Sequence, residues 1–295
     1  MYISMPTDNF RQETMNNLCR RFSFLKKEIY GASLCGRPLE AYFIGNPQNL
    51  SLLCAGVHGC EYLTVLTLMN FTKDLCRTVE SGGTAGGFYM GRFLSRRGVC
   101  IIPCVNPDGN EIAVCKNADI GKYRQLVDSI TDKPQLWKAN AAGVDLNHNF
   151  NAGWKELKQL EIASGITSPA STCYGGESPE SEPESRCLAN FCRSISLGKA
   201  FAFHSQGREI YCDFGDSTPK RSFEIAEILA NSSGYTVSRP DAIATGGGFK
   251  DWIIEELKKP AMTIEIGLGE NPLPLCDFEP EYNRIFEMLC FCCVL

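Results

Sequence analysis

The stretch Leu50-Ser-Leu-Leu-Cys-Ala55-Gly-Val-His58-Gly-Cys-Glu61 decides the fold of this 295-residue chain. Its first half, Leu50 to Ala55, is a short apolar run of the length expected for a buried strand. A helix is predicted from Glu61 to about Val79, and a second buried strand from Val99 to Val105. A strand, helix and strand in this order join parallel neighbours by a right-handed crossover. The stretch therefore predicts an open α/β sheet, with His58 beyond the carboxyl end of a strand, where such sheets bind ligands.

Apolar patterns elsewhere extend this architecture over the whole chain. An amphipathic helix is predicted over about residues 8–25, and the turn at Cys35-Gly36-Arg37 joins two extended runs into a hairpin. Further central strands are predicted over Phe201–Phe203 and Ala261–Ile266. The length suits one large domain. We therefore expect an α/β/α sandwich around a mixed, largely parallel central sheet, in a single domain over residues 1–295 that includes the N-terminal helix.

Composition excludes several classes of protein. The chain is 44% hydrophobic and 21% charged, and its formal net charge of −5 argues against a nucleic-acid partner, which requires a basic surface. No apolar stretch approaches the roughly 20 residues that cross a bilayer. Residues Met1 to Phe10 lack the pattern of a signal peptide, and many of the 16 cysteines lie in apolar runs, as buried free thiols do. We expect a cytoplasmic protein with reduced cysteines and no membrane partner.

Histidine is scarce in this chain, which contains only His58, His148 and His204. His58 and Glu61 are three residues apart just past the first predicted strand, and His204 directly follows a later one. Two histidines and one glutamate form the open ligand set of a catalytic zinc, which leaves a position for water or substrate. We therefore predict one zinc per chain, bound by His58, Glu61 and His204. The alternatives are an incidental surface turn at His58 and a core histidine at His204.

Several short motifs follow one another in a characteristic order. They are Asn106-Pro107-Asp108-Gly109, Gly143-Val-Asp145-Leu-Asn147-His148, Pro179-Glu-Ser-Glu182-Pro-Glu184-Ser185, Asp251-Trp252 and Ala261-Met-Thr-Ile-Glu265. Together with the pair His58 and Glu61, this order resembles the zinc carboxypeptidase family over about Tyr30 to Pro274. The closer resemblance is to the bacterial γ-D-glutamyl-diamino-acid peptidases that trim cell-wall peptides. It rests on His204-Ser-Gln-Gly207, Gly246-Gly-Gly-Phe-Lys-Asp-Trp252 and Gly267-Leu-Gly-Glu-Asn-Pro272-Leu-Pro274.

The resemblance implies roles for residues around the zinc. Glu265 would be the general base that takes a proton from water and delivers it to the leaving amine. The alternative is a strand-end glutamate paired with a lysine, although an inward-facing carboxylate is costly without a partner. Asp145 would accept a hydrogen bond from a ligand histidine and fix its orientation, unless a backbone carbonyl does so. Asn147 and His148 would contact the substrate.

Two positions depart from the family pattern. His148 stands where the family usually has an arginine that binds a C-terminal carboxylate, and imidazole is a weaker, only partly charged donor. This replacement argues against ordinary C-terminal trimming, unless His148 is only a turn histidine. Ala142 stands where an arginine normally stabilises the oxyanion. Three explanations remain: Lys138 or Arg208 takes the place of this arginine, zinc stabilises the oxyanion alone, or catalysis is impaired. We favour Arg208, which lies four residues beyond His204 and offers two donors to one oxyanion.

These features lead to one preferred function and two alternatives. The preferred function is a zinc metallopeptidase, a hydrolase of the amide bond between γ-D-glutamate and a diamino acid, meso-diaminopimelate or lysine. Its substrates would be small peptides derived from the cell wall, and we expect no separate cell-wall-binding module. The alternatives are a metallocarboxypeptidase of ordinary C-terminal specificity and a zinc-bearing peptide-binding protein disabled by Ala142. The intact Glu265 counts against the second alternative.

Overall fold

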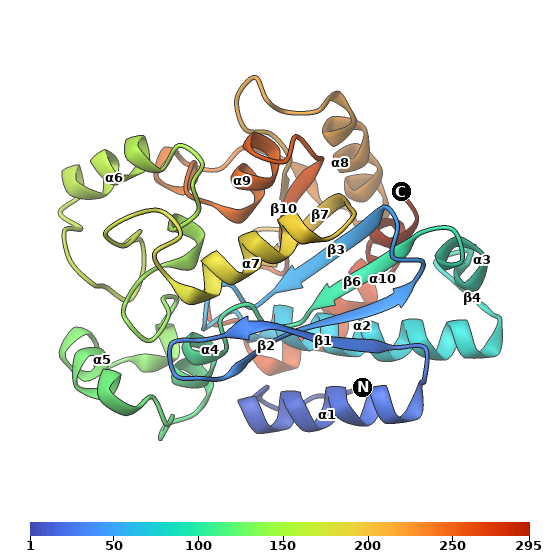
Figure 1. Ribbon diagram of the computed structural model, residues 1–295, viewed down its shortest axis with the longest axis horizontal. Coiled ribbons are helices and arrows are strands. Elements are labelled where there is room, and N and C mark those ends of the chain that lie inside the picture. Colours follow the sequence, from blue (N-terminus) through green and yellow to red (C-terminus); the bar gives the residue numbers. More distant parts are fainter.

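A mixed sheet of eight strands forms the centre of the fold in the computed structural model, which describes residues 1–295 (Figure 1). Across the sheet the order is β1 (Lys26–Ala32), β2 (Pro38–Gly45), β6 (Gly98–Ile102), β3 (Leu50–Ala55), β7 (Leu197–His204), β10 (Ala261–Glu265), β8 (Glu209–Tyr211) and β9 (Thr236–Val237). Strands β6, β3, β7 and β10 run parallel, whereas β2 pairs antiparallel with β6 and β8 pairs antiparallel with β10. A separate two-stranded ladder consists of β4 (Thr84–Ala85) and β5 (Phe88–Tyr89).

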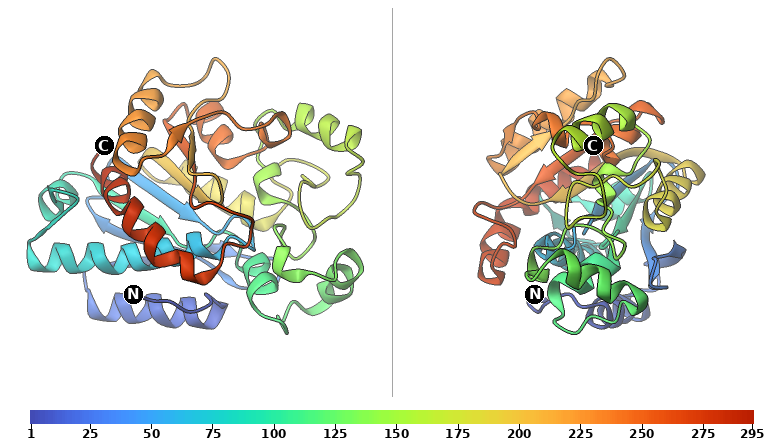
Figure 2. Two further views of the ribbon diagram at one scale, coloured as in Figure 1. Left: turned by 180° about the vertical axis from the view of Figure 1, so that it is seen from behind. Right: turned by 90° about the vertical axis from the view of Figure 1, so that its left-hand side faces the viewer.

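Helices cover both faces of this sheet. They are α1 (Asp8–Arg21), α2 (Tyr62–Ser81), α3 (Met90–Leu94), α4 (Pro107–Val114), α5 (Arg124–Ile130), α6 (Trp154–Ala163), α7 (Pro183–Ser194), α8 (Lys220–Ser233), α9 (Phe249–Glu255) and α10 (Phe278–Val294). Helix α7 crosses one face of the sheet in Figure 1, and α2, α8 and α10 lie on the opposite face, seen from behind in Figure 2. The predicted α/β/α sandwich around a mixed, largely parallel sheet is confirmed.

Side chains of the central strands alternate between two apolar cores. Leu52 and Cys54 of β3 belong to the core that α7 and α9 complete, whereas Leu53 and Ala55 belong to the larger core beneath α1, α2, α8 and α10. All six residues of β3 are buried. A parallel strand covered on both faces needs apolar residues at nearly every position. This explains why Leu50–Ala55 is apolar at every position except the buried Ser51 and shows no polar alternation.

The predicted elements are present with shifts at their ends. The first helix ends at Arg21 rather than near residue 25, because Phe22 has an extended backbone. The strand predicted over Val99–Val105 ends at Ile102, directly before Pro103, whose nitrogen cannot donate to a ladder. The crossover from β3 through α2 to the parallel strand β6 is present as predicted.

Close packing of loops at the carboxyl ends of the strands fixes the backbone that carries His58. The Asn106 amide donates to the carbonyl oxygens of Val57 and Ala139, each at 3.0 Å. A Cβ atom on Gly59 would lie 2.2 Å from the carbonyl oxygen of Gly109, so only glycine fits there. The turn between β3 and α2 is therefore held rigidly against the neighbouring segments.

Two further features relate to the expectations of reduced cysteines and of no membrane partner. All 16 cysteines are free thiols, and most of them are buried. None of the helices combines the length and the apolar character that a membrane span requires.

Candidate metal centre and active site

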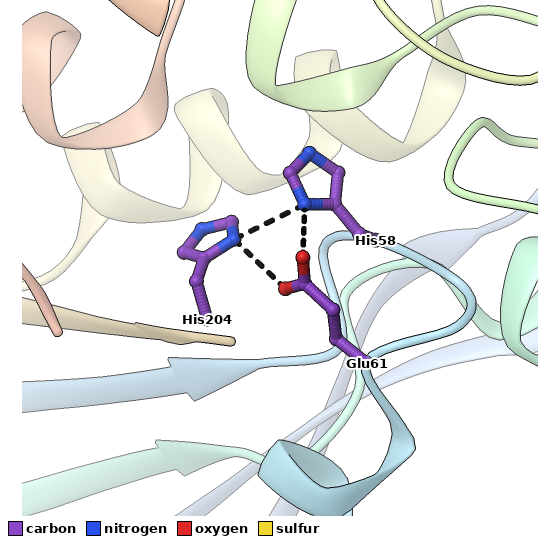
Figure 3. A group of neighbouring side chains, drawn as sticks. All are labelled: His58, Glu61 and His204. Atoms are coloured by element: carbon purple, nitrogen blue, oxygen red, sulfur yellow. Dashed lines mark hydrogen bonds and ion pairs between the residues drawn. The ribbon is translucent and has the colours of Figure 1, made fainter. Parts of the chain in front are cut away.

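Three side chains from two neighbouring strands converge at the carboxyl edge of the sheet (Figure 3). His58 lies in the turn after β3, and Glu61 is the N-cap residue of α2. His204 is the last residue of β7, which pairs in parallel with β3. Adjacent parallel strands end side by side, so this pairing brings the distant His204 to His58 and Glu61.

The distances between these side chains fit a single metal ion. His58 Nδ1 lies 2.8 Å from Glu61 Oε1, His204 Nδ1 lies 3.1 Å from Glu61 Oε2, and the two Nδ1 atoms are 3.3 Å apart. Ligands at zinc bond lengths of about 2.0–2.2 Å in a tetrahedron are about 3.3–3.6 Å apart. Glu61 and His204 are buried. Two imidazole nitrogens and a carboxylate that face one another form the donor set of a catalytic zinc, and small outward shifts of the side chains would bring them to these separations.

Opposite charges shift the pKa values of this cluster. Burial lowers the pKa of His58, but the carboxylates of Glu61 and Asp145 outweigh it and raise the pKa to about 10. Burial raises the pKa of Glu61, but His58 and His204 outweigh it, so the pKa falls below its ordinary value. Burial lowers the pKa of His204. Glu61 is therefore a carboxylate at neutral pH, as a metal ligand must be.

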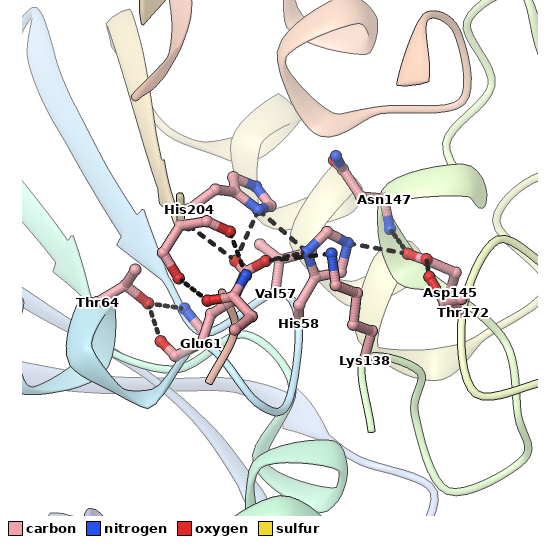
Figure 4. A network of polar contacts seen from close by, with 12 residues as sticks. Val57, His58, Glu61, Thr64, Lys138, Asp145, Asn147, Thr172 and His204 are labelled. Carbon is pink, nitrogen blue, oxygen red and sulfur yellow. Dashed lines mark hydrogen bonds and ion pairs between the residues drawn. The ribbon is translucent and has the colours of Figure 1, made fainter. Parts of the chain in front are cut away.

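Asp145 holds the outer nitrogen of His58 (Figure 4). His58 Nε2 lies 3.1 Å from Asp145 Oδ1, and the backbone N–H of Cys173 donates to Asp145 Oδ2 at 2.8 Å. Asp145 is fully buried and caps the short helix η3 (Leu146–His148). This geometry lets Asp145 accept the Nε2–H of His58, so that Nδ1 is the nitrogen that would give up its proton and bind a metal.

Glu265 is the last residue of β10, at the same edge of the sheet. It lies in register with His204 of β7 on one side and with Glu209 of β8 on the other. Burial, followed by the nearby Glu61 carboxylate, raises the pKa of Glu265 to about 8. A cation bound at the three ligands would lower that pKa, because it stabilises the negative charge.

A cavity of about 390 Å³ opens over these residues. Its lining includes His58, Glu61, Lys138, Asp145, Asn147, His148, Tyr211, Asp241, Ile243, Lys250, Asp251 and Glu265. The cavity therefore brings together the predicted base, two of the three predicted metal ligands and two of the predicted substrate-binding residues. His204 lies beneath it, against Glu61.

Asn147 and His148 present polar groups to this cavity from η3. The Asn147 side-chain oxygen accepts a hydrogen bond from the backbone N–H of Phe249 at 3.1 Å, so its amide N–H groups remain for a ligand. Glu161 Oε1 lies 2.9 Å from His148 Nδ1, and Lys158 pairs with the same carboxylate. Because Glu161 holds Nδ1, the Nε2 atom is the one that can bind a substrate.

The structure does not bring Arg208 to the cavity. Its guanidinium donates to Glu281 of α10 at 2.6 Å, and Arg208 is absent from the cavity lining. Arg208 follows a turn and has a left-handed backbone with φ of 53°, which directs its side chain away from His204. Four residues of spacing bring side chains together on a helix but not across a turn. In this structure Arg208 therefore lies apart from the metal cluster, paired with Glu281, and nothing here supports the preference for Arg208 over Lys138.

Lys138 lies beside the metal ligands instead. Its Nζ is 3.7 Å from Glu61 Oε1, and it lines the cavity. Burial lowers the pKa of Lys138, but Glu61 and Asp145 outweigh it and raise the pKa, so the side chain stays charged. Ala142 lies outside the cavity lining, and its backbone N–H donates to Asn140 at 3.0 Å.

Lys250 and Asp251 of α9 belong to motifs quoted from the sequence, but no role in the site was predicted for this charged pair. Both residues are buried, both line the cavity, and they form an ion pair with each other. The available signal was the position of the two charges between the apolar residues Phe249 and Trp252, where buried charges need a specific reason.

Comparisons with known proteins agree with this geometry. The family model described as zinc carboxypeptidase matches residues 12–287. The chain is 32% identical over 267 residues to the γ-D-glutamyl-L-diamino acid endopeptidase 1 of Lysinibacillus sphaericus, which covers 89% of this chain and 66% of that protein. It is 27% identical to murein peptide amidase A of Escherichia coli K12, with coverage of 88% of this chain and 87% of that protein.

A solved structure shows the same fold. Bovine thrombin-activatable fibrinolysis inhibitor, solved in complex with tick carboxypeptidase inhibitor, superposes with a TM-score of 0.74 at 21% identity, over 99% of this chain and 97% of that one. The family match spans nearly the whole sequence, and the converging ligand set is the one expected for zinc. The chain therefore belongs to the zinc carboxypeptidase family of metallopeptidase hydrolases.

Proposed function

We propose that this protein hydrolyses the amide bond between γ-D-glutamate and a diamino acid in small cell-wall peptides. The observation that carries the proposal is the cluster His58, Glu61 and His204, with Glu265 beside it at one cavity. The two bacterial relatives are named for γ-D-glutamyl-diamino acid and murein peptide substrates, which supports this bond. Free thiols throughout the chain support a reducing compartment, the cytoplasm, as its place of action.

Glu265 performs the proton transfers in the proposed mechanism. His58, Glu61 and His204 would hold the zinc, which would serve as a Lewis acid that acidifies a water and polarises the scissile carbonyl. Glu265 accepts a proton from the attacking water, and its carboxyl group then donates that proton to the leaving nitrogen of the diamino acid. Asp145 keeps His58 in the orientation that binds the metal.

Lys138 takes the place of the missing arginine at Ala142 in this proposal. Its ammonium group lines the cavity beside Glu61, where negative charge develops on the scissile oxygen. A cation fixed before the reaction stabilises that charge without reorganisation. This role for Lys138 removes the main reason to regard the chain as a disabled peptide-binding protein.

The substrate-binding part of the proposal rests on Asn147 and His148. A carboxypeptidase of ordinary C-terminal specificity needs a strong fork of donors for the terminal carboxylate, and His148 has only Nε2 to offer because Glu161 holds Nδ1. Asn147 and His148 together orient the substrate by hydrogen bonds that are weaker than those of an arginine. This arrangement favours a peptide substrate that the protein also binds at other points. The chain acts as a single domain in this proposal.

The bond itself is tested by product analysis. We expect incubation with the murein tripeptide L-Ala-γ-D-Glu-meso-diaminopimelate to release L-Ala-D-Glu and free diaminopimelate, measured by mass spectrometry. A tetrapeptide that ends in D-Ala would distinguish the rival: release of D-Ala alone would show ordinary carboxypeptidase activity and contradict the proposed bond.

Removal of a zinc ligand should remove the metal. We expect His58→Ala, Glu61→Ala and His204→Ala each to reduce zinc from about one per chain to a trace, because three protein ligands are needed to hold a catalytic zinc. Metal analysis by plasma mass spectrometry after dialysis measures this. His148→Ala is the matched control and should retain zinc, since Glu161 and not the cluster holds it. Full zinc occupancy in His204→Ala would refute the ligand assignment.

Loss of the base should abolish turnover and spare the metal. Glu265→Gln keeps the shape of the side chain but cannot accept a proton, so we expect kcat to fall by several orders of magnitude with zinc content unchanged. Glu209→Gln is the matched control, because Glu209 lies in register with Glu265 on the next strand but outside the cavity lining. Normal turnover in Glu265→Gln would exclude it as the base.

The oxyanion role of Lys138 can be separated from that of Arg208. We expect Lys138→Met to lower kcat by about 100- to 1000-fold, the effect of removing a preorganised oxyanion donor. Arg208→Met should leave kcat within a few-fold of the natural protein, because Arg208 pairs with Glu281 away from the cavity. Steady-state kinetics on zinc-loaded protein measures both. The reverse outcome, with Arg208→Met impaired and Lys138→Met normal, would restore the interpretation from sequence.

A further inference from the structure

Lys250 is a buried cation in the wall of the active-site cavity, separate from the metal cluster. It lies on α9, is 6% exposed, and lines the cavity. Its ammonium group donates to the carbonyl oxygen of Asp213 at 2.6 Å and to the carboxylate of Asp251. An ammonium group has three N–H donors. Two are used within the protein, and the third is available to a ligand.

The groups around Lys250 form a subsite with both signs of charge. Asp251 is 2% exposed and accepts a hydrogen bond from the backbone N–H of Gly246 at 2.8 Å, which fixes its orientation. Asp241 lines the same cavity and is exposed. Asn147 adds amide N–H groups, because Phe249 already holds its oxygen. A fixed cation, Lys250, and a fixed anion, Asp251, therefore lie together beyond the metal cluster, with the exposed Asp241 on the same cavity.

The two candidate diamino acids differ in the group at the end of the side chain. Lysine ends in an ammonium group alone. meso-Diaminopimelate ends in an ammonium group and a carboxylate on the same carbon. Carboxylates such as Asp251 and Asp241 suit either ammonium group, but only meso-diaminopimelate has a carboxylate at the end of its side chain that can accept from Lys250.

We propose that Lys250, paired with Asp251, is the specificity determinant that selects a diamino acid with a side-chain carboxylate, meso-diaminopimelate, over lysine. This inference rests on the proposed function and specifies its substrate. The free N–H of Lys250 donates to the side-chain carboxylate of the diamino acid, while Asp251 and Asp241 face its ammonium group. Lys138 does not serve this purpose, because it lies on Glu61 at the metal end of the cavity.

Burial strengthens this discrimination. A charged hydrogen bond inside a cavity gains more than the same bond in water, since water competes less for the two groups. A substrate that lacks the carboxylate leaves the third N–H of Lys250 without a partner. Sites built to hydrogen-bond a substrate group reject analogues that lack the group for this reason.

A cycle of enzyme and substrate variants tests the proposal. Three zinc-loaded proteins are compared: the natural chain, Lys250→Met, and the control Lys199→Met. Lys199 is another buried lysine, on β7, whose amine donates to Ser51 at 3.2 Å outside the cavity. Each protein is assayed on L-Ala-γ-D-Glu peptides that end in meso-diaminopimelate, in meso-diaminopimelate amidated on its side-chain carboxylate, or in L-lysine.

We expect the natural chain to cleave the free meso-diaminopimelate peptide with a kcat/KM about 10- to 100-fold above the other two peptides, the effect of one charged hydrogen bond. Lys250→Met should lose that preference, mainly through KM, and should treat all three peptides alike. The effects of Lys250→Met and of amidation should not add, because both remove the same contact. Lys199→Met should keep the preference.

Several outcomes would overturn the proposal. Equal cleavage of the three peptides by the natural chain would refute the specificity role and leave the proposed function intact. If Lys250→Met lowered kcat/KM equally for the lysine peptide and the meso-diaminopimelate peptide, Lys250 would contact a group that both substrates share. No cleavage of any peptide would refute both proposals. Lys250→Met could fail to fold because Asp251 loses its partner. In that case the double variant Lys250→Met with Asp251→Asn removes both charges and replaces the single variant. The preference of the natural chain among the three peptides tests the specificity role without any variant.

Discussion

A buried carboxylate between two imidazoles is the constraint on which this site depends. Glu61 is 2% exposed, and a buried charge is unfavourable unless opposite charges and hydrogen bonds offset its loss of water. His58 supplies a positive charge, and His204 and the backbone N–H of Ser205 supply hydrogen bonds to the same carboxylate, at 3.1 and 3.3 Å. These partners come from the ends of β3 and β7, so the cluster holds only while the two strands stay paired in register. The sheet and the metal centre therefore stabilise each other.

The carboxylates of the motif from Pro179 to Ser185 stabilise the cavity wall and do not reach the metal cluster. Glu182 accepts a hydrogen bond from Asn140 at 2.7 Å, and Glu184 accepts one from the backbone of Leu34 at 3.0 Å. Burial raises the pKa of Glu184 to about 7. Asn149 also contacts this motif, because its amide donates to the hydroxyl oxygen of Ser181 at 3.0 Å. The motif thus pins the loops that carry Asp145 and Asn147 over the carboxyl ends of the strands.

Sequence patterns predicted the parts of the site that follow from strand order. Apolar runs located β3, β7 and β10, and the residue just past or at the end of each run is a predicted ligand or the predicted base. Residues that depend on how a loop turns were beyond this reasoning. Arg208 is near His204 in sequence, yet the left-handed backbone at Arg208 directs its side chain to Glu281. Lys138 precedes η3 in an irregular segment, and only the tertiary packing brings it to Glu61.

In this family arginine usually stabilises the oxyanion and also binds the carboxylate of the substrate. In this chain other side chains share these two functions. Arginine is absent both at Ala142 and at His148. The cavity contains two lysines instead: Lys138 beside Glu61 at the metal cluster, and Lys250 beside Asp251 on α9. Lysine is a compact point charge, whereas arginine presents a planar fork of donors. A cavity with two separate point charges suits a substrate whose charged groups are far apart, as in a γ-linked peptide that ends in a long diamino acid. A single terminal carboxylate held by one fork does not require that arrangement.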